Sequence, residues 1–527
     1  ADDSSIPQVT PGLGLLTDHD REILEGYGLE LAPRTEEKLS REYTIVYTTC
    51  AQPAQKLYVT WSAQGETGGE KRPSFLIERL ETLFPQCQRR EEPAPSPDQL
   101  RSLAAGIPSI RAALSEAPRS AALFRHLDQA ARWQRGRLSP GAVSALYGKK
   151  VPMSASRMDQ YQSCHFAYFL RYGLDARARR PAGFDAPEYG TFVHYVLEHV
   201  LRAIQDQGGA AQVSDEAIQG FATQAVRDYV HGKLGGMEHQ TPRFRYLFRR
   251  LEKGVRAVVE NVVAELRSSD FQPLWFELGF GYGPDKSLPP VNRTSHGITL
   301  SISGFVDRVD GWRNEKDGRL YLRVVDYKTG RKSFDLTEVW NGLGLQLLLY
   351  LFTLEREGSP LFGEQPVPAG VLYLPAREAV LKGSRTMDEA ARQKELDKEL
   401  LRKGLILEDA DVVEAMEHGE GSLRFLPVKV KTKKDETTIS GDVLVSAEKL
   451  GRLDLHIQTI LSQICQEIAR GNIDADPFWR SKEQNACTYC EFAQACQFEE
   501  SAEATGDHRR WAPTVENKTF WANLSQT

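Results

Sequence analysis

The 527-residue sequence contains no uninterrupted apolar run approaching 18 residues and no recognisable signal peptide. A membrane-spanning helix needs about 20 mostly apolar residues, so these absences predict a soluble, cytoplasmic protein. Internal repeats and extended low-complexity tracts are also missing. The hydrophobic fraction of 41% is nevertheless ample for real cores, and the length predicts two to four domains.

An excess of positive charge is missing too, because the formal net charge is −6. Any contact with nucleic acid must therefore come from local basic patches. One dense stretch interleaves basic and aromatic residues: Arg243, Phe244, Arg245, Tyr246, Phe248, Arg249, Arg250, Lys253 and Arg256. A second stretch contains Lys429, Lys431, Lys433 and Lys434. The two stretches are as consistent with a solvated helix face and a charged loop as with a channel that holds phosphates while bases stack.

Two β-rich runs, 301–310 and 320–330, carry the most informative residues. The first contains Asp307, and the second contains Asp326 and Lys328. Because strand side chains alternate between faces, Asp326 and Lys328 project to the same side. Carboxylates suit magnesium or manganese, and the neighbouring lysine can orient a metal-activated water. A lone D-x-K triplet, however, is more often an exposed strand end with a surface ion pair.

Two helices complete a pattern around these strands. His194 lies on an amphipathic helix opened by Gly190, and Gln346 and Tyr350 lie on the helix after the second strand. Taken alone, His194 would more often be a histidine of the hydrophobic core, and Gln346 and Tyr350 would simply share one face of a helix. Together they resemble the RecB-type branch of the PD-(D/E)xK nucleases. The family pattern reads here as Gly190 and His194 (G-x-x-x-H), Gly304, Asp307, Arg308 and Asp310 (G-x-x-D-R-x-D), Asp326 and Lys328 (D-x-K), and Gln346 and Tyr350 (Q-x-x-x-Y).

The resemblance implies an α/β fold in which helices flank a mixed central sheet. It also implies the roles of the motif residues. The ligands of Mg²⁺ (or Mn²⁺) would be His194, Asp307, Asp326 and the carbonyl of Tyr327. The catalytic lysine would be Lys328, and the supporting residues would be Gln346 and Tyr350.

Three of the seven cysteines, Cys487, Cys490 and Cys496, form a C-x2-C-x5-C cluster whose thiolates can converge on one metal centre. Cys164 is the best candidate for a fourth ligand. Spacing alone leaves zinc and an iron–sulfur cluster open, and His165 remains an alternative zinc ligand. One cysteine before the nuclease core and three after it resemble the 4Fe-4S staple of AddB-type and Cas4-type nucleases, although His165 stands where that family commonly has proline.

A staple of this kind would join segments more than 300 residues apart and stabilise the intervening core. The remaining cysteines fall outside the pattern and are expected to be ordinary buried thiols. They are Cys50, Cys87 and Cys465.

The N-terminal region is expected to belong to a larger protein, because the sequence begins at Ala1 and its first 62 residues cannot easily form a domain alone. Leu39 to Trp61 resembles the last motif of superfamily 1 helicases, in which an arginine reaches the ATP γ-phosphate. Gln52 occupies that position here. The phosphate-binding pattern G-x-x-x-x-G-K-[ST] occurs nowhere, so no ATP hydrolysis by that route is expected.

We therefore predict three parts: an inactive helicase-like remnant with accessory helices (1–150), a stapled nuclease domain (151–500) and a tail (501–527). Residues 154–290 are expected to be largely helical, 295–328 and 368–375 to be strands, and 441–470 to be a helix. Less regular features are also expected: a turn at Gly65 to Gly69, a linker from Glu91 to Pro97 and a helix from Ala121 to Arg135. The aromatic tail can pack on a partner or on its own domain.

A defunct helicase fold fused to a stapled nuclease resembles the B subunit of AddAB helicase-nucleases. This resemblance implies a heterodimer with an ATP-hydrolysing AddA-type subunit, resection of double-strand breaks for recombinational repair, and cutting of the 5′-terminated single strand of DNA. The alternatives are a stand-alone Cas4-like exonuclease and a non-catalytic DNA-binding scaffold. The complete set of metal ligands and lysine argues against the scaffold.

Overall fold

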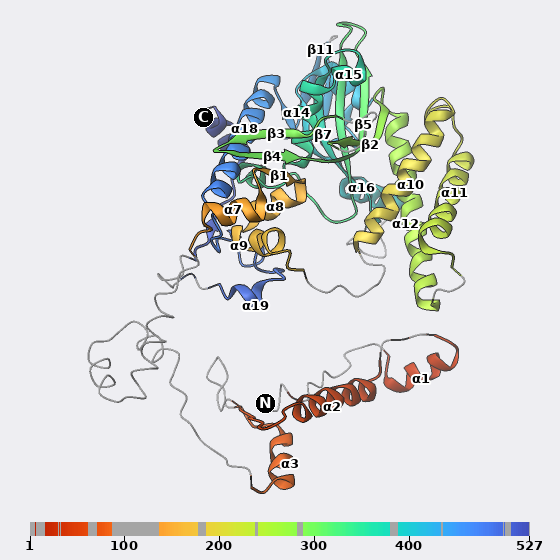
Figure 1. Ribbon diagram of the computed structural model, residues 1–527. Helices are drawn as coiled ribbons and strands as arrows, with labels where there is room; N and C mark the ends of the chain where they lie inside the picture. Colours follow the sequence, from red (N-terminus) through yellow and green to blue (C-terminus); the bar gives the residue numbers. More distant parts are fainter. Residues whose placement is uncertain are drawn as a thin grey trace. The chain divides into compact units, whose positions relative to one another are not determined.

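The structure is a computed structural model that describes residues 6, 16–29, 31, 33–61, 71–86, 136–177, 186–237, 241–281, 288–379, 388–433, 436–498, 500 and 507–525 (Figure 1). Two compact units divide the chain: Ala1–Ile107 with Glu238–Arg249, and Pro108–Met237 with Arg250–Thr527. Several predicted features lie outside the described residues, namely the turn at 65–69, the linker at 91–97, the helix at 121–135, Cys87 and Lys434. In the described residues, no helix is long and apolar enough to cross a membrane.

The first unit contains α1 (Asp18–Gly26), α2 (Thr35–Ala51) and α3 (Phe75–Leu83). A capping box between Thr17 and Asp20 starts α1, since each side chain accepts from the other's backbone N–H. Neither α1 nor α2 buries a side chain, and Ile77 is the buried residue of α3. Gln52, the position of the helicase arginine, is the C-cap of α2.

A six-stranded mixed sheet in the order β12-β8-β7-β6-β5-β2 lies in the second unit. Its strands are β2 (Gln272–Phe280), β5 (Gly304–Arg313), β6 (Leu320–Lys328), β7 (Val367–Pro375), β8 (Lys403–Leu407) and β12 (Leu444–Val445). β2, β5 and β6 pair antiparallel, whereas β6 and β7 pair parallel. β6 is buried on both faces up to Tyr327, and its buried charges, Arg323 and Asp326, are paired with Asp310 and Lys328. The predicted mixed sheet is confirmed.

Helices flank this sheet, as predicted. α10 packs against α11 and the edge strand β2, and α14 packs against β6 and β7 (Figure 1). The helices around the sheet are α10 (Ala186–Asp206), α11 (Asp215–Leu234), α12 (Pro242–Arg267), α13 (Leu336–Trp340), α14 (Gln346–Glu357), α15 (Ser359–Phe362), α16 (Glu389–Glu399) and α17 (Ala410–Met416). α10 begins at Ala186, so Gly190 lies within its first turns rather than opening it.

Two smaller sheets accompany the central one. The first, in the order β1-β4-β3, consists of β1 (Lys150–Met153), β4 (Ile298–Ile302) and β3 (Val291–Ser295). The long helix α18 (Ala447–Ala469) packs on β3 and β4. The second, in the order β11-β10-β9, consists of β11 (Glu436–Ser440), β10 (Lys429–Lys433) and β9 (Gly421–Ser422). Ahead of β1 and after it lie α7 (Pro140–Tyr147), α8 (Ala155–Ser163), α9 (His165–Tyr168) and a π-helical turn (Phe169–Gly173).

The segment 154–290 is largely helical, as predicted, but its end contains the edge strand β2, whose exposed and buried residues alternate at its start. One expected boundary is wrong. The helix predicted over 441–470 begins only at Ala447, because Ser446 caps its first turn and the two residues before that cap form β12.

The described part of the C-terminal tail packs on its own unit. β14 (Arg510–Trp511) pairs with β13 (Phe478–Trp479), which lies near the short helix α19 (Ala493–Cys496). The last helix, α20 (Asn517–Leu524), packs against α13 and α18 and buries Phe520 completely. Of the two packing modes considered for the tail, the structure thus shows contact with its own domain.

Candidate active site and cysteine cavity

Asp307 and Tyr327 connect the two strands at the candidate active site. The backbone N–H of Tyr327 on β6 donates to Oδ2 of Asp307 on β5 at 2.7 Å. Asp307 is 8% exposed, so its carboxylate is held in a largely dry setting. A buried carboxylate needs such hydrogen bonds or a cation to compensate its charge.

His194 reaches this carboxylate from α10. Its Nδ1 lies 3.4 Å from Oδ1 of Asp307, and its Nε2 lies 3.1 Å from the Tyr327 carbonyl oxygen. Burial disfavours a charged imidazole, but hydrogen bonding to Asp307 and the charge of that residue outweigh burial and raise the pKa of His194 to about 9. This shift favours the protonated imidazolium, in which both ring nitrogens are donors.

Asp326 and Lys328 lie on the same face of β6, as their spacing predicts, with Nζ 2.5 Å from Oδ2. Burial and the nearby charge of Asp307 raise the pKa of Asp326 to about 6, despite the opposing influence of Lys328. The Lys328 ammonium also lies 5.5 Å from the ring centroid of Tyr373 on β7. The structure thus places Asp326, Tyr327 and Lys328 of β6 near Asp307 and His194. Asp326 is not part of the group of described ligand atoms that lie within 4.8 Å of one another.

Glu277 is an additional acidic residue at this site. A carboxylate oxygen of Glu277, a ring nitrogen of His194 and a carboxylate oxygen of Asp307 all lie within 4.8 Å of one another. Burial, and then the charge of Asp307, raise the pKa of Glu277 to about 7. Sequence reasoning missed this residue because its strand was expected to be helical. A strand reading of Trp275 to Phe280 would have placed an acidic residue beside Asp307.

Gln346 and Tyr350 are, as expected, one turn apart on α14, and Gln346 is its first residue. The Tyr350 ring stacks on Phe280 of β2, with centroids 4.9 Å apart. The same ring lies against the backbone of β5 at Gly304. Tyr350 therefore packs behind the strands that carry Asp307 and Glu277, which is a supporting position.

Arg308 and Asp310 point to the opposite face of β5 from Asp307. Asp310 bonds Arg308 at 2.7 Å and Arg323 of β6 at 2.8 Å, and all three side chains are completely buried. Arg323 also approaches Glu265 of α12, with the closest atoms 3.4 Å apart. The pair between Asp310 and Arg323 crosses from β5 to β6, and it favours the register that keeps Asp307 beside Tyr327.

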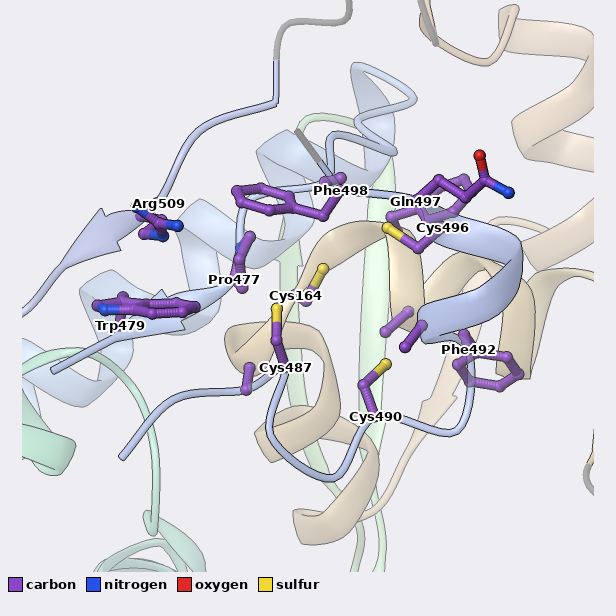
Figure 2. A pocket seen from close by; sticks show the side chains of 15 residues that line it. Cys164, Pro477, Trp479, Cys487, Cys490, Phe492, Cys496, Gln497, Phe498 and Arg509 are labelled. Atoms are coloured by element: carbon purple, nitrogen blue, oxygen red, sulfur yellow. The ribbon is translucent and has the colours of Figure 1, made fainter. Parts of the chain in front are cut away.

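The four cysteines predicted to share a metal centre line one cavity of about 350 Å³ (Figure 2). Cys164 comes from the α8–α9 junction, Cys487 and Cys490 from the loop after β13, and Cys496 from the end of α19. All four are free thiols. Burial raises the pKa of Cys164 to about 12, and burial together with Cys490 and Cys496 raises that of Cys487 to about 11.

The cavity is wider than a single zinc ion requires. Tetrahedral zinc with bonds of about 2.3 Å would place its sulfur ligands about 3.8 Å apart. Of the cysteines that the structure describes, no three have sulfur atoms within 4.8 Å of one another. The walls are mostly apolar, and one cation, Arg509, stacks over Trp479 with its guanidinium 4.3 Å from the ring centroid.

His165 does not lie among the described residues that line this cavity. Its Nδ1 is 2.5 Å from Oδ2 of Asp476, its backbone N–H donates to Oδ1 of the same residue, and both side chains are buried. The imidazole thus anchors the segment behind Cys164, which disfavours His165 as a zinc ligand. Among the other cysteines, Cys465 is buried as expected, whereas Cys50 is only half-buried.

The two basic stretches lie on regular elements. The stretch from Arg243 to Arg256 lies on α12, where Phe248 is buried and Tyr246 is 63% exposed. In the second stretch, Lys429, Lys431 and Lys433 alternate on β10, so they share one exposed face of a small sheet rather than a charged loop.

Several curated bacterial proteins are similar to nearly the whole chain, and each is named as the B subunit of an ATP-dependent helicase/deoxyribonuclease. The chain is 28% identical to the protein from Clostridium novyi, over 95% of this chain and 46% of that protein. The protein from Clostridium perfringens (strain 13) is 28% identical over 99% of this chain and 47% of its own length. The protein from Acetivibrio thermocellus is 29% identical over 95% of this chain and 46% of its own length. The chain therefore spans about half the length of these relatives.

A family model provides the classification. The model of the PD-(D/E)XK nuclease superfamily matches residues 152–497, which include every strand of the central sheet and all four cysteines of the cavity. Together with the mixed sheet and the site on β5 and β6, this match shows that the chain belongs to the PD-(D/E)XK nuclease superfamily.

Proposed function

We propose that this chain is a magnesium- or manganese-dependent deoxyribonuclease that cuts single-stranded DNA as part of a helicase-nuclease. The observation that carries the proposal is the convergence of His194, Asp307 and Asp326 beside Lys328. Three separate elements contribute these side chains, so no local secondary-structure preference explains their meeting.

The donor set fits a hard divalent cation. Carboxylate and carbonyl oxygens are typical ligands of magnesium and manganese, and the imidazole of His194 is the one nitrogen donor of the set. Asp307 and Asp326 are buried close enough to raise the pKa of Asp326. That repulsion is what a divalent cation would relieve. Such a cation would polarise a phosphoryl oxygen and lower the pKa of a bound water.

The chain's own residues have distinct roles in this proposal. Lys328, whose side chain is 30% exposed, orients the attacking water and neutralises charge that develops on the phosphoryl oxygens. Asp326 fixes the lysine through their ion pair. His194 would have to release a ring proton to hold the cation, so metal binding would be coupled to proton release. Tyr350 keeps β5 in place from behind, and Gln346 begins the helix that carries this tyrosine.

Asp326→Ala tests this assignment. We expect loss of magnesium-dependent cleavage of end-labelled single-stranded DNA, with the circular dichroism spectrum, iron content and DNA affinity close to wild type. Wild-type cleavage by the variant would refute the site. An exposed acid on the preceding loop, Asp317, offers a control, because Asp317→Ala leaves β6 intact and should keep activity.

We further propose that Cys164, Cys487, Cys490 and Cys496 hold a 4Fe-4S cluster with a structural role. The support is a cavity of about 350 Å³ that is lined by four free thiols. Their sulfur atoms lie farther apart than the ligands of one zinc ion would. Iron and sulfide analysis of anaerobically purified protein tests it. About four irons per chain are expected, whereas one zinc and no iron would contradict the proposal.

The name that the relatives share supports the larger assembly. We propose that the chain functions with an AddA-type ATP-hydrolysing subunit, that the complex resects double-strand breaks for recombinational repair, and that this nuclease cuts the 5′-terminated strand. Gln52 lacks the charge of the helicase arginine, so unwinding should need the partner. Co-purification with an AddA-type subunit, followed by ATPase and strand-specific cleavage assays, tests this. ATP hydrolysis by this chain alone would contradict it.

A further inference from the structure

Glu277 lies on β2, directly beside Asp307 on β5. The antiparallel register pairs Phe276 with Arg308 and Leu278 with Val306, which leaves Glu277 next to Asp307. Two acidic side chains at neighbouring positions on one face of a sheet repel each other. A cation bound between the two carboxyl groups would relieve that repulsion.

The backbone of Glu277 adopts a conformation that side-chain-bearing residues rarely take. Its φ angle is +49°, although it lies in the middle of a strand. The other described non-glycine residues with positive φ are Asp175, His296 and Gln497, and all three lie outside strands. Such strain is unfavourable and persists where the surroundings impose it, commonly at functional sites.

The carboxylate of Glu277 is close to the other candidate ligands. One of its oxygens lies within 4.8 Å of both a His194 nitrogen and an Asp307 oxygen. Ligands about 2.1 Å from one octahedral cation lie about 3.0 Å apart when adjacent and about 4.2 Å apart when opposite. At least two of the three pairs must be adjacent on one cation, so a single cation can accommodate all three if those ligand atoms move closer together by at most about 1.8 Å.

No described basic residue forms a salt bridge with Glu277. Arg202, which stacks over the neighbouring Phe276, is engaged with Glu198 at 2.9 Å and with the backbone carbonyl of Phe276 at 3.3 Å. His194 is directed to Asp307 and Tyr327 instead. Among the described residues Glu277 thus has no salt-bridge partner, and a bound cation would supply one.

We propose that Glu277 is a further protein ligand of the nuclease's divalent cation, and that the left-handed backbone at this position is retained to aim its carboxylate at His194 and Asp307. The inference rests on the proposed metal-dependent nuclease. It adds a third carboxylate to the ligands expected from the family motifs. It also explains why strain is located on the edge strand rather than in a loop.

Manganese binding tests the inference without relying on activity. In the full chain, Glu277→Gln should weaken Mn²⁺ affinity, measured by isothermal titration or electron paramagnetic resonance, by at least about 10-fold. Glu198→Gln is the matched control, because it removes a nearby negative charge whose carboxylate already bonds Arg202. The control should change Mn²⁺ affinity by less than about threefold.

Thermal unfolding separates a ligand from a structural residue. In EDTA, Glu277→Gln should melt at or above the wild-type temperature, because it removes repulsion with Asp307. Glu277→Gly, which relieves the positive φ, should behave likewise. Added Mn²⁺ should raise the melting temperature of the wild type more than that of either variant.

The outcomes distinguish this inference from the function on which it rests. Unchanged Mn²⁺ affinity in Glu277→Gln, alongside weakened affinity in Asp307→Asn, would overturn the role of Glu277 and leave the metal site standing. A strongly lowered melting temperature of both Glu277 variants in EDTA would also overturn it, in favour of a structural role. No Mn²⁺ binding by the wild type would overturn both proposals.

Discussion

The hydroxyl of Tyr350 occupies the space that a Cβ atom at Gly304 would need. This contact links two motifs that are separate in the sequence, because the tyrosine lies on α14 and the glycine begins β5. Glycine at position 304 is thus required by close approach of a side chain to the strand backbone. Gly190, the glycine before His194, has no comparable restriction, since its nearest neighbour to an added Cβ is Oγ1 of Thr329 at 3.7 Å.

The two glycines should therefore respond differently to alanine. Gly304→Ala must displace Tyr350 or bend β5, so we expect a loss of about 1–3 kcal/mol of stability and reduced cleavage. Gly190→Ala lies within α10 and should be neutral or slightly stabilising, because alanine favours helix. Chemical denaturation of both variants checks this. Equal stability of the two would show that Tyr350 is easily displaced.

The buried ion pairs behind the site should matter far more than surface pairs. Asp310→Ala leaves Arg308 and Arg323 buried without their carboxylate, and should lower the free energy of unfolding by about 3–5 kcal/mol. The partly exposed pair of Arg356 and Asp454 offers a control. Asp454→Ala should reduce stability by less than about 1 kcal/mol. Similar losses in urea unfolding would contradict the register-locking role of Asp310.

The cysteine staple can be tested by two alanine substitutions of similar size. Cys490→Ala removes a cavity thiol and should abolish stable iron binding. If the staple is worth about 2–4 kcal/mol, as cross-links of long loops are, the melting temperature should fall by about 5–15 °C. Cys465→Ala alters a buried thiol that bonds the Arg293 carbonyl and lies outside the cavity, so its iron content should remain normal. Normal iron in Cys490→Ala would refute the staple.

His456 makes stability depend on pH near neutrality. Burial lowers its pKa below the usual 6.5, although Nε2 donates to the Trp340 carbonyl. The unfolded chain then binds this proton more tightly than the folded protein does. His456 therefore contributes stability above about pH 6.5 that is lost as the pH falls below that value.

His456→Phe keeps a ring against Trp340, whose centroid is 4.8 Å away, but cannot titrate. The difference in unfolding free energy between pH 8 and pH 5 should be smaller in this variant than in the wild type. Other titrating groups are common to both proteins and cancel in the comparison. An identical pH dependence would show that His456 is accessible to protons in the fold.

Motif spacing made much of the site predictable. Strand alternation correctly placed Asp326 and Lys328 on one face, and the order of the motifs correctly brought His194 to Asp307. The position of Cys164 beside the three C-terminal cysteines was also predictable. Cysteines spaced C-x2-C-x5-C commonly bind a metal centre, and such a centre needs a fourth ligand.

Other features depend on tertiary contacts that no local pattern encodes. Glu277 was not predicted as a site residue, because residues 154–290 were expected to be largely helical. It lies instead on an edge strand and has a positive φ angle, which the local sequence does not indicate. The engagement of His165 with Asp476 joins residues 311 positions apart. The C-terminal helix packs on its own unit because Phe520 is buried and α20 packs against α13 and α18, and this contact is not visible in the local sequence.

The most direct test of the account is magnesium-dependent cleavage of end-labelled single-stranded DNA by the wild type, Lys328→Ala and Lys332→Ala. Lys332 is a nearby lysine that pairs with Glu338 at 2.8 Å and serves as the control. We predict metal-dependent cutting by the wild type and Lys332→Ala, with a loss of at least about 100-fold in Lys328→Ala. Equal cleavage by all three proteins would contradict the assignment of the active site.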